Sequence, residues 1–495
     1  MQQGVVAIAA VLIRTASQFT LGIVAAHELS TGEFGLFSIG TALLAIGVPL
    51  ASAGMSNAAL IVASRFRASS RRDTSEFADL RAVLWQAAVA SMMSTLMVFA
   101  ALFICFEVLF DASYGATLTV VAMLSTLLGL SPIEPLLFGV QGLGNILPKV
   151  LILHVWIPGF RLFVAVVGFA LGWDLYSLGA AFLLTTLTLP IAAWMLLRRY
   201  EPAMLLVSRH DLWPRWGEIR QLLPISIPIM AIMGLTVALQ HVDNIFVGAL
   251  SDNHEAGLYG LSLRIALFLS VATLALTNLV NPKIAYHVSS ANREELESTL
   301  NRSSGLYALL IAPLWVVMAL EPTFIIELLV GVEYEGAAWP LRMLATGQLV
   351  FTTFNAFGWM LASSTFRTMD LLLLSVCLTV SVCANGYLDR EWGALGASAA
   401  NMTALTMLGA LRVVVAIRVF ALCGGPPLRM LGSLVVIICS VGFLVISGWG
   451  DCHRLLRLMT VEVGVVGLLI VVAGHDTRKW LVDFARGKLI RVTRS

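Results

Sequence analysis

Two arginines lie deep inside long apolar stretches of the sequence, where a charged side chain is costly and usually functional. Arg14 lies about ten residues into the first stretch, near mid-membrane for a helix that rises about 1.5 Å per residue, and Gln18 follows one turn later. Arg161 lies similarly deep in a later stretch, with His154 and Pro158 close by. The planar, permanently charged guanidinium suits phosphate or pyrophosphate. These residues therefore predict a cationic substrate-binding cavity.

Each of these positions also has a structural interpretation. For Arg14 and Arg161 we favour cavity lining over a structural ion pair, because acidic residues are scarce within the apolar stretches. Gln18 would extend the polar stripe that Arg14 begins. His154 is included in the cavity, although a satisfied structural role is the better interpretation of this residue taken alone. Basic groups with few acidic partners indicate an anionic cargo.

A second group of polar residues lies in the later half of the chain. Gln240, Asp243 and Asn244 share one helical face through their i, i+3 and i+4 spacing. Asp243 and Arg264 lie at similar distances before and after a short polar turn, so a hairpin would bring them to the same depth. We predict an ion pair or gate between Asp243 and Arg264, a structural pair being favoured, and assign Gln240 and Asn244 to polar lining or ion coupling.

Other charged residues in apolar stretches have less distinctive positions. Glu134 lies between two prolines and is a candidate for polar lining or ion coupling. Arg342 and Arg412 lie near the ends of their stretches, and we expect both to snorkel to the membrane surface. The six cysteines have no CxxC spacing, so neither a metal site nor a resident cofactor is expected.

The composition restricts the elements that can carry these residues. The chain has 495 residues, of which 59% are hydrophobic and only 12% charged, whereas a soluble protein is roughly one quarter charged. Continuous apolar runs of about 20 residues recur from end to end, as expected of helices that span a membrane. The sequence thus predicts an all-α polytopic membrane protein. The net charge of only +2 argues against a nucleic-acid partner.

One motif occurs twice, about 220 residues apart, which indicates an internal duplication. His27–Ile39 and Ala249–Leu261 each contain a polar turn followed by Glu-x-Gly-Leu-aromatic, and each lies between two apolar runs. A second match in the same order relates Tyr176–Ala181 to Gly393–Ser398. Because both halves would begin in the cytoplasm, the repeats are predicted to be parallel and related by a pseudo-two-fold axis along the membrane normal.

We predict 14 transmembrane helices, arranged as two six-helix lobes plus two C-terminal helices. The predicted organisation is an N-terminal lobe at 1–200, a cytoplasmic linker at 201–221, a C-terminal lobe at 222–420, and two extra spans with a basic tail at 421–495. Lysine and arginine concentrate on one side of these spans, which places both termini in the cytoplasm. The predicted spans lie near 4–25, 36–62, 82–108, 116–139, 148–170, 177–197, 222–250, 257–281, 303–328, 339–363, 370–388, 392–418, 428–448 and 455–474.

Two segments resemble a known family. Leu29–Phe37 is similar to the pattern Leu-Gly-x-x-x-(Phe/Tyr)-Gly, with Ser30 in place of the first Gly, and Val242–Gly248 with Glu255–Tyr259 resembles the signature of the second half. On these residues the chain resembles the Wzx-type flippases, polysaccharide transport proteins of the MOP superfamily. The resemblance extends over nearly the whole chain and identifies the superfamily better than the cargo.

The resemblance implies a function. Such a protein would move an undecaprenyl-pyrophosphate-linked oligosaccharide, an O-antigen or exopolysaccharide repeat unit, from the cytoplasmic to the periplasmic leaflet of the bacterial inner membrane. Alternating access of two lobes around a cationic cavity would carry it, coupled to H⁺ or Na⁺. Membrane lipid, a polysaccharide polymerase and a chain-length regulator are the implied partners. No enzymatic activity is expected.

Three other functions remain open at this point. A lipid II flippase also has fourteen spans and cavity arginines, so the cargo could be the peptidoglycan precursor. A cation-coupled multidrug antiporter of the same superfamily would more naturally have an acidic cavity. A membrane glycosyltransferase or polysaccharide polymerase would act on similar lipid-linked sugars, but the short loops predicted here leave little room for its catalytic site.

Overall fold

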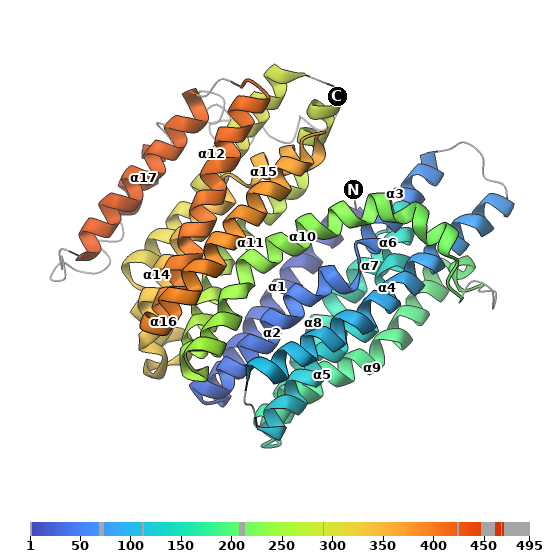
Figure 1. Ribbon diagram of the computed structural model, residues 1–495, viewed down its shortest axis with the longest axis horizontal. Coiled ribbons are helices and arrows are strands. Elements are labelled where there is room, and N and C mark those ends of the chain that lie inside the picture. The colour runs from blue at the N-terminus through green and yellow to red at the C-terminus, as the bar shows by residue number, and fades with distance from the viewer. Residues whose placement is uncertain are drawn as a thin grey trace. The chain divides into compact units, whose positions relative to one another are not determined.

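The computed structural model describes residues 2–68, 74–110, 113–206, 213–290, 292–422, 425–446, 461–466 and 468–469 (Figure 1). Every regular element in these residues is a helix, and nine of the described helices are long and apolar enough to cross a membrane. The predicted all-α polytopic class is confirmed. The count of fourteen spans stays a prediction, because several spans are interrupted and the last lies largely outside the described residues. By internal contacts the chain divides into Met1–Gly260 and Leu261–Ser495.

The first unit is a bundle in which α1 packs against α7, η1 and α8, and α10 packs along α2, α3 and α4. Buried side chains from several of these helices, among them Leu84, Leu137, Leu189 and Ile219, form a continuous apolar core. The elements are α1 (Gln2–Glu28), α2 (Thr31–Ala51), α3 (Met55–Ala68), α4 (Thr74–Leu109), α5 (Tyr114–Leu130), α6 (Glu134–Gly142), α7 (Leu147–Val150), the π-helix η1 (Leu151–Trp156), α8 (Ile157–Ala170), α9 (Leu175–Tyr200), the 3₁₀-helix η2 (Pro202–Leu205) and α10 (Trp216–Leu250).

In the second unit, α14 packs against both α12 and α16, and α15 packs on α16. Helix α11 (Asn253–Ser289) begins in the first unit and continues into the second. The remaining elements are α12 (Arg293–Leu320), α13 (Pro322–Val330), the 3₁₀-helix η4 (Val332–Ala337), α14 (Ala338–Thr353), α15 (Asn355–Ser363), α16 (Arg367–Val419) and α17 (Gly425–Ile446).

Breaks in the helices lie within one predicted span and between two others. The span predicted at 36–62 is divided between α2 and α3, where Ala53 and Gly54 have φ values of 47° and 68°. A Cβ on Gly54 would collide with the carbonyl oxygen of Ser226 in α10, so glycine permits the close approach of α10 to this turn. The spans predicted at 370–388 and 392–418 are the two arms of α16, which is kinked at Gly393.

The repeated motif forms a capped turn in both of its copies. In the first, the Ser30 hydroxyl accepts a hydrogen bond from the Glu33 N–H, and the Glu33 carboxylate accepts one from the Ser30 N–H, so the two residues close a capping box on α2. In the second, the Asp252 carboxylate accepts from the Glu255 N–H, 2.7 Å away, at the start of α11. The polar turn that opens a helix is therefore confirmed twice.

The described ends of the predicted linker 201–221 are both attached to α4. The Trp85 indole N–H donates to the carbonyl oxygen of Met204 at 3.0 Å. The buried Gln86 amide donates to the carbonyl oxygen of Trp213 at 3.0 Å and accepts from the Arg215 N–H at 2.7 Å. Residues 207–212 lie outside the described residues. The predicted domain boundaries, which rest on the repeat, stay a prediction.

Candidate functional site

The best-defined group of charges lies in the first unit, where α1 faces the segment formed by α7, η1 and α8. Arg14 and Gln18 are both exposed on α1, one turn apart. The positive charge of Arg14 acts on Lys149 in α7 and on His154 in η1, and α1 packs against both of these elements. The structure thereby brings together two of the predicted site residues, Arg14 and His154. It adds Lys149, which lies at the edge of the predicted span 148–170 and was not among the predicted site residues.

The segment that carries His154 departs from α-helical geometry. Leu151–Trp156 is a π-helix, followed directly by Ile157 and Pro158. Proline has no N–H to donate to the carbonyl four residues earlier, which here belongs to His154, so a widened turn at this place is physically reasonable. The imidazole Nδ1 of His154 and the indole N–H of Trp156 are buried and lack hydrogen-bond partners within the described residues. Short π-helical segments often occur at functional sites.

Lys149 and Glu134 form the other part of this group. The Lys149 ammonium donates to the Gln141 side-chain oxygen at 2.9 Å and lies 3.6 Å from the centroid of the Phe138 ring. The negative charge of Glu134 acts on Lys149. One Glu134 carboxylate oxygen accepts a hydrogen bond of 3.0 Å from the Ser56 hydroxyl. We call Arg14, Lys149, His154 and Glu134 the cationic cluster.

Arg161 occupies a different environment from Arg14. It is buried, with 9% of its surface exposed; one of its terminal nitrogens donates to the Thr126 hydroxyl at 3.4 Å, and its guanidinium lies 3.8 Å from the centroid of the Phe182 ring. Its Nε is buried without a hydrogen-bond partner among the described residues. Its assignment to the cavity stays a prediction.

The polar residues of α10 are largely buried. Asp243 is fully buried and accepts a hydrogen bond of 3.3 Å from the Tyr259 hydroxyl, which belongs to the second copy of the repeated motif. Asn244 is also buried, and Gln240 is half-buried. Arg264 is half-buried and belongs to the second unit. The proposed contact between Asp243 and Arg264 therefore stays a prediction.

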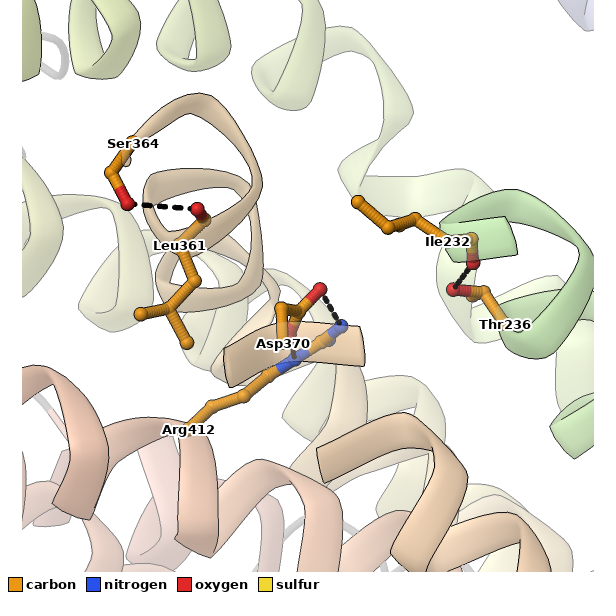
Figure 2. Close-up of polar contacts among 6 residues, drawn as sticks. All are labelled: Ile232, Thr236, Leu361, Ser364, Asp370 and Arg412. Carbon is orange, nitrogen blue, oxygen red and sulfur yellow. Dashed lines mark hydrogen bonds and ion pairs between the residues drawn. The ribbon is translucent and has the colours of Figure 1, made fainter. Parts of the chain in front are cut away.

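The sequence-based interpretation missed a buried ion pair in the second unit. Figure 2 shows Asp370 and Arg412 facing each other, with Nε 2.9 Å from Oδ1 and Nη2 3.2 Å from Oδ2. The two residues come from opposite arms of α16, and Gly358 of α15 packs directly against the guanidinium. The expectation that Arg412 snorkels to the membrane surface is wrong, because only 4% of the residue is exposed.

Arg342 makes defined contacts at the end of its helix, and its expected snorkelling stays a prediction. Its Nε donates to the carbonyl oxygen of Ala319 at 2.9 Å, and its guanidinium lies 4.6 Å from the centroid of the Trp339 ring. This arginine thus joins α14 to the end of α12 and is half-buried.

A stripe of fully buried polar residues also runs along α16. Its members are Ser381, Asn385 and Asp389 on the first arm and Ser398 and Asn401 on the second. The Asn385 amide donates to the Ser381 hydroxyl at 3.4 Å. The i, i+4 spacing of the first three is visible in the sequence, and their burial is the information that the structure adds. In the described residues, no group of three or more His, Cys, Asp or Glu residues could hold a metal ion.

Comparison with solved structures identifies the fold. An inward-facing multidrug resistance MATE family transporter of the MOP superfamily has a TM-score of 0.64 and 14% identity, and the match covers 84% of this chain and 98% of that one. The lipid II flippase MurJ in an inward closed conformation has a TM-score of 0.63 and 12% identity, with 96% and 100% covered. A MOP superfamily transporter from Pyrococcus furiosus has a TM-score of 0.58 and 14% identity, with 84% and 94% covered.

At such identities these similarities establish the fold alone. No curated protein sequence matches the chain. Residues 24–338, well over half of the sequence, match the family described as "Polysaccharide biosynthesis protein". The resemblance inferred from the repeated motif is therefore confirmed: the chain belongs to the polysaccharide biosynthesis protein family and has the fold of the MOP superfamily transporters.

Proposed function

We propose that this protein is a flippase for an undecaprenyl-pyrophosphate-linked oligosaccharide, an O-antigen or exopolysaccharide repeat unit. It would bind the lipid-linked sugar from the cytoplasmic leaflet and release it into the periplasmic leaflet by alternating access. The observation that carries this proposal is the cationic cluster: Lys149 and His154 lie on consecutive elements, α7 and η1, that pack against α1, the helix that carries Arg14. An excess of positive charge at this place suits a pyrophosphate headgroup.

The setting of the protein follows from the same proposal. It would lie in the bacterial inner membrane with both termini in the cytoplasm, and it would act beside a polysaccharide polymerase and a chain-length regulator. Transport would be coupled to H⁺ or Na⁺. The protein would carry out no chemical reaction on the sugar, so it would not be an enzyme.

A lipid II flippase is the second candidate function. The solved lipid II flippase MurJ aligns with 96% of this chain, more than the 84% covered by the MATE transporter. Its cargo also carries a polyprenyl pyrophosphate, so the cationic cluster fits both cargoes. A multidrug antiporter is less well supported, because a cluster with excess positive charge disfavours cationic drugs.

The test is a chromosomal deletion of the gene, complemented by wild-type protein. We expect the deletion strain to accumulate lipid-linked oligosaccharide on the cytoplasmic side and to lose the surface glycan, and the wild-type protein to restore both. Accumulated lipid II with an intact glycan would instead favour the second candidate. Normal levels of both precursors in the deletion strain would refute the flippase proposal.

A further inference from the structure

Lys149 is held inside the bundle by contacts that a surface lysine would not need. It is one of two lysines in the described part of the chain; the other, Lys283, is exposed. The Lys149 ammonium lies 2.9 Å from the Gln141 side-chain oxygen and 3.6 Å from the centroid of the Phe138 ring, both in α6. The pairing of α6 with α7 thus keeps a mobile, strongly hydrated cation at one fixed place in the protein.

The charges around Lys149 do not balance locally. Glu134 in α6 is the carboxylate whose charge acts on Lys149, while Arg14 and Lys149 both act on His154. Two basic side chains, Arg14 and Lys149, and the His154 imidazole are thus grouped with one carboxylate. That carboxylate is itself half-buried and engaged by the Ser56 hydroxyl at 3.0 Å. The arrangement can accept a further anion.

The polar groups of the cluster also retain free hydrogen-bonding capacity. Within the described residues, the buried His154 Nδ1 has no hydrogen-bond partner. An ammonium carries three donors, of which Gln141 uses one. An oxygen of a phosphate group could accept hydrogen bonds from these groups without displacing the bond from Lys149 to Gln141, which uses only one of the three ammonium donors.

We propose that Lys149 is a further anion-binding residue of the cationic cluster, and that Glu134 is an internal counter-charge against which a phosphate group of the cargo competes. This inference rests on the proposed function and specifies its binding step. In the empty protein, Glu134 and Gln141 balance and position the ammonium. A pyrophosphate, with more negative charge than one carboxylate, takes over the ammonium and leaves Glu134 with Ser56 as its hydrogen-bond partner.

The experiment measures binding of inorganic pyrophosphate to the purified full-length protein in nanodiscs of uncharged lipid, by titration calorimetry. We expect Lys149→Gln to weaken binding about tenfold or more, because a charge-assisted hydrogen bond is lost. Lys149→Arg keeps the charge and should stay within a few-fold of wild type. Glu134→Gln removes the competing anion and should tighten binding several-fold. The matched control Lys283→Gln removes the same charge from an exposed site and should bind like wild type.

A purely structural role of Lys149 predicts different results. Gln141→Leu removes the partner of Lys149 but not its charge, so it should leave pyrophosphate affinity nearly unchanged if Lys149 binds the anion. If Lys149 only supports the packing of α6 and α7, Gln141→Leu should resemble Lys149→Gln in both binding and thermal stability. That outcome, or wild-type affinity in Lys149→Gln, overturns the proposal. Weaker binding in Glu134→Gln also overturns it.

Two further measurements test whether the anion is an ordinary lipid headgroup, and whether a negative result concerns only the role of Lys149 or the proposed function itself. Titrations in nanodiscs that contain phosphatidylglycerol test whether the cluster prefers an ordinary lipid headgroup; loss of the difference between wild type and Lys149→Gln would assign the site to bulk lipid and refute the inference. Complementation of the deletion strain is measured in parallel. If wild type restores export but does not bind pyrophosphate, or if Lys149→Gln both binds and exports normally, the inference alone fails. If wild type does not affect the glycan, the proposed function fails.

Discussion

Charged side chains inside this protein are used in two contrasting ways. In the second unit, Arg412 meets Asp370 through two hydrogen bonds of 2.9 and 3.2 Å, and both side chains are at most 5% exposed. In the first unit, Arg14, Lys149 and His154 face one carboxylate, and Arg14 remains exposed. A compensated pair stabilises the packing of helices, whereas an excess of one charge creates capacity for a ligand. The comparison predicts that mutations of the compensated pair reduce stability most. Mutations of the cationic cluster should instead reduce export most.

The largest loss of stability is expected at Asp370 and Arg412. Asp370→Asn and Arg412→Gln each leave one buried charge unpaired, so each should lower the free energy of unfolding by about 3–5 kcal/mol. The double variant should be far less destabilised than the sum of the two, because neither charge then remains. Thermal unfolding of the purified protein measures all three.

A partly exposed ion pair provides the control for this cycle. Arg215 and Glu218 lie 3.0 Å apart, but their side chains are 39% and 29% exposed. Glu218→Gln should therefore change stability by less than about 1 kcal/mol. Additive losses at Asp370 and Arg412, or a loss as large in Glu218→Gln, would contradict the interpretation of the buried pair.

A smaller effect is expected at Asp243 and Arg264, if they pair as the sequence predicts. Asp243 is fully buried but already accepts a hydrogen bond from Tyr259, and Arg264 is half-buried, so each is less dependent on the other than Asp370 is on Arg412. Asp243→Ala and Arg264→Ala should each cost about 1–3 kcal/mol, and the double variant should be little worse than either. Strictly additive losses, measured by the same unfolding assay, would argue against contact.

The two ion pairs show which parts of this structure could be predicted from the sequence. The hairpins were predictable because their signals are local: Ser30 and Glu33 are three residues apart and cap the same helix. The pairing of Asp370 with Arg412 joins residues 42 positions apart, and it depends on the kink at Gly393 and on how the arms of α16 are aligned. The expectation for Arg412 used only its distance from the end of a span, and that distance does not indicate which residue of the other arm it will contact.

The same limit affected the candidate site. The depth of Arg14 could be recognised from apolar run length, and Pro158 marks a place where helical hydrogen bonding is interrupted, but the π-helix before it was not predicted. Lys149 follows Pro148 at the predicted edge of a span, where a basic residue is ordinary and does not indicate a site. Its contacts with Gln141 and Phe138 come from the packing of α6 beside α7. Arg161 likewise has an aromatic neighbour, Phe182, that no local pattern relates to it.

Arg161 should show an intermediate effect that separates its two interpretations. Its guanidinium packs on the Phe182 ring and donates to Thr126, so Arg161→Met should cost about 1–2 kcal/mol through the lost cation–π contact and hydrogen bond. Phe182→Leu should reproduce part of this loss while keeping the positive charge. If Arg161 lines the cavity, export falls in Arg161→Met but survives in Phe182→Leu at equal protein levels. Equal export in both, measured as surface glycan, would make Arg161 a structural residue.

The smallest change in stability, together with a large loss of export, is expected at Arg14. Its side chain is exposed on α1, so Arg14→Ala should change the free energy of unfolding by less than about 0.5 kcal/mol. The same substitution removes one of the cations that act on His154, and we expect surface glycan to decrease at least several-fold while membrane insertion remains normal. Leu12→Ala, at a neighbouring exposed position, is the matched control and should retain export. Normal export in Arg14→Ala would mean that the excess charge of the first unit is not used for binding. The cationic cluster would then differ from the Asp370–Arg412 pair in its charge balance but not in its function.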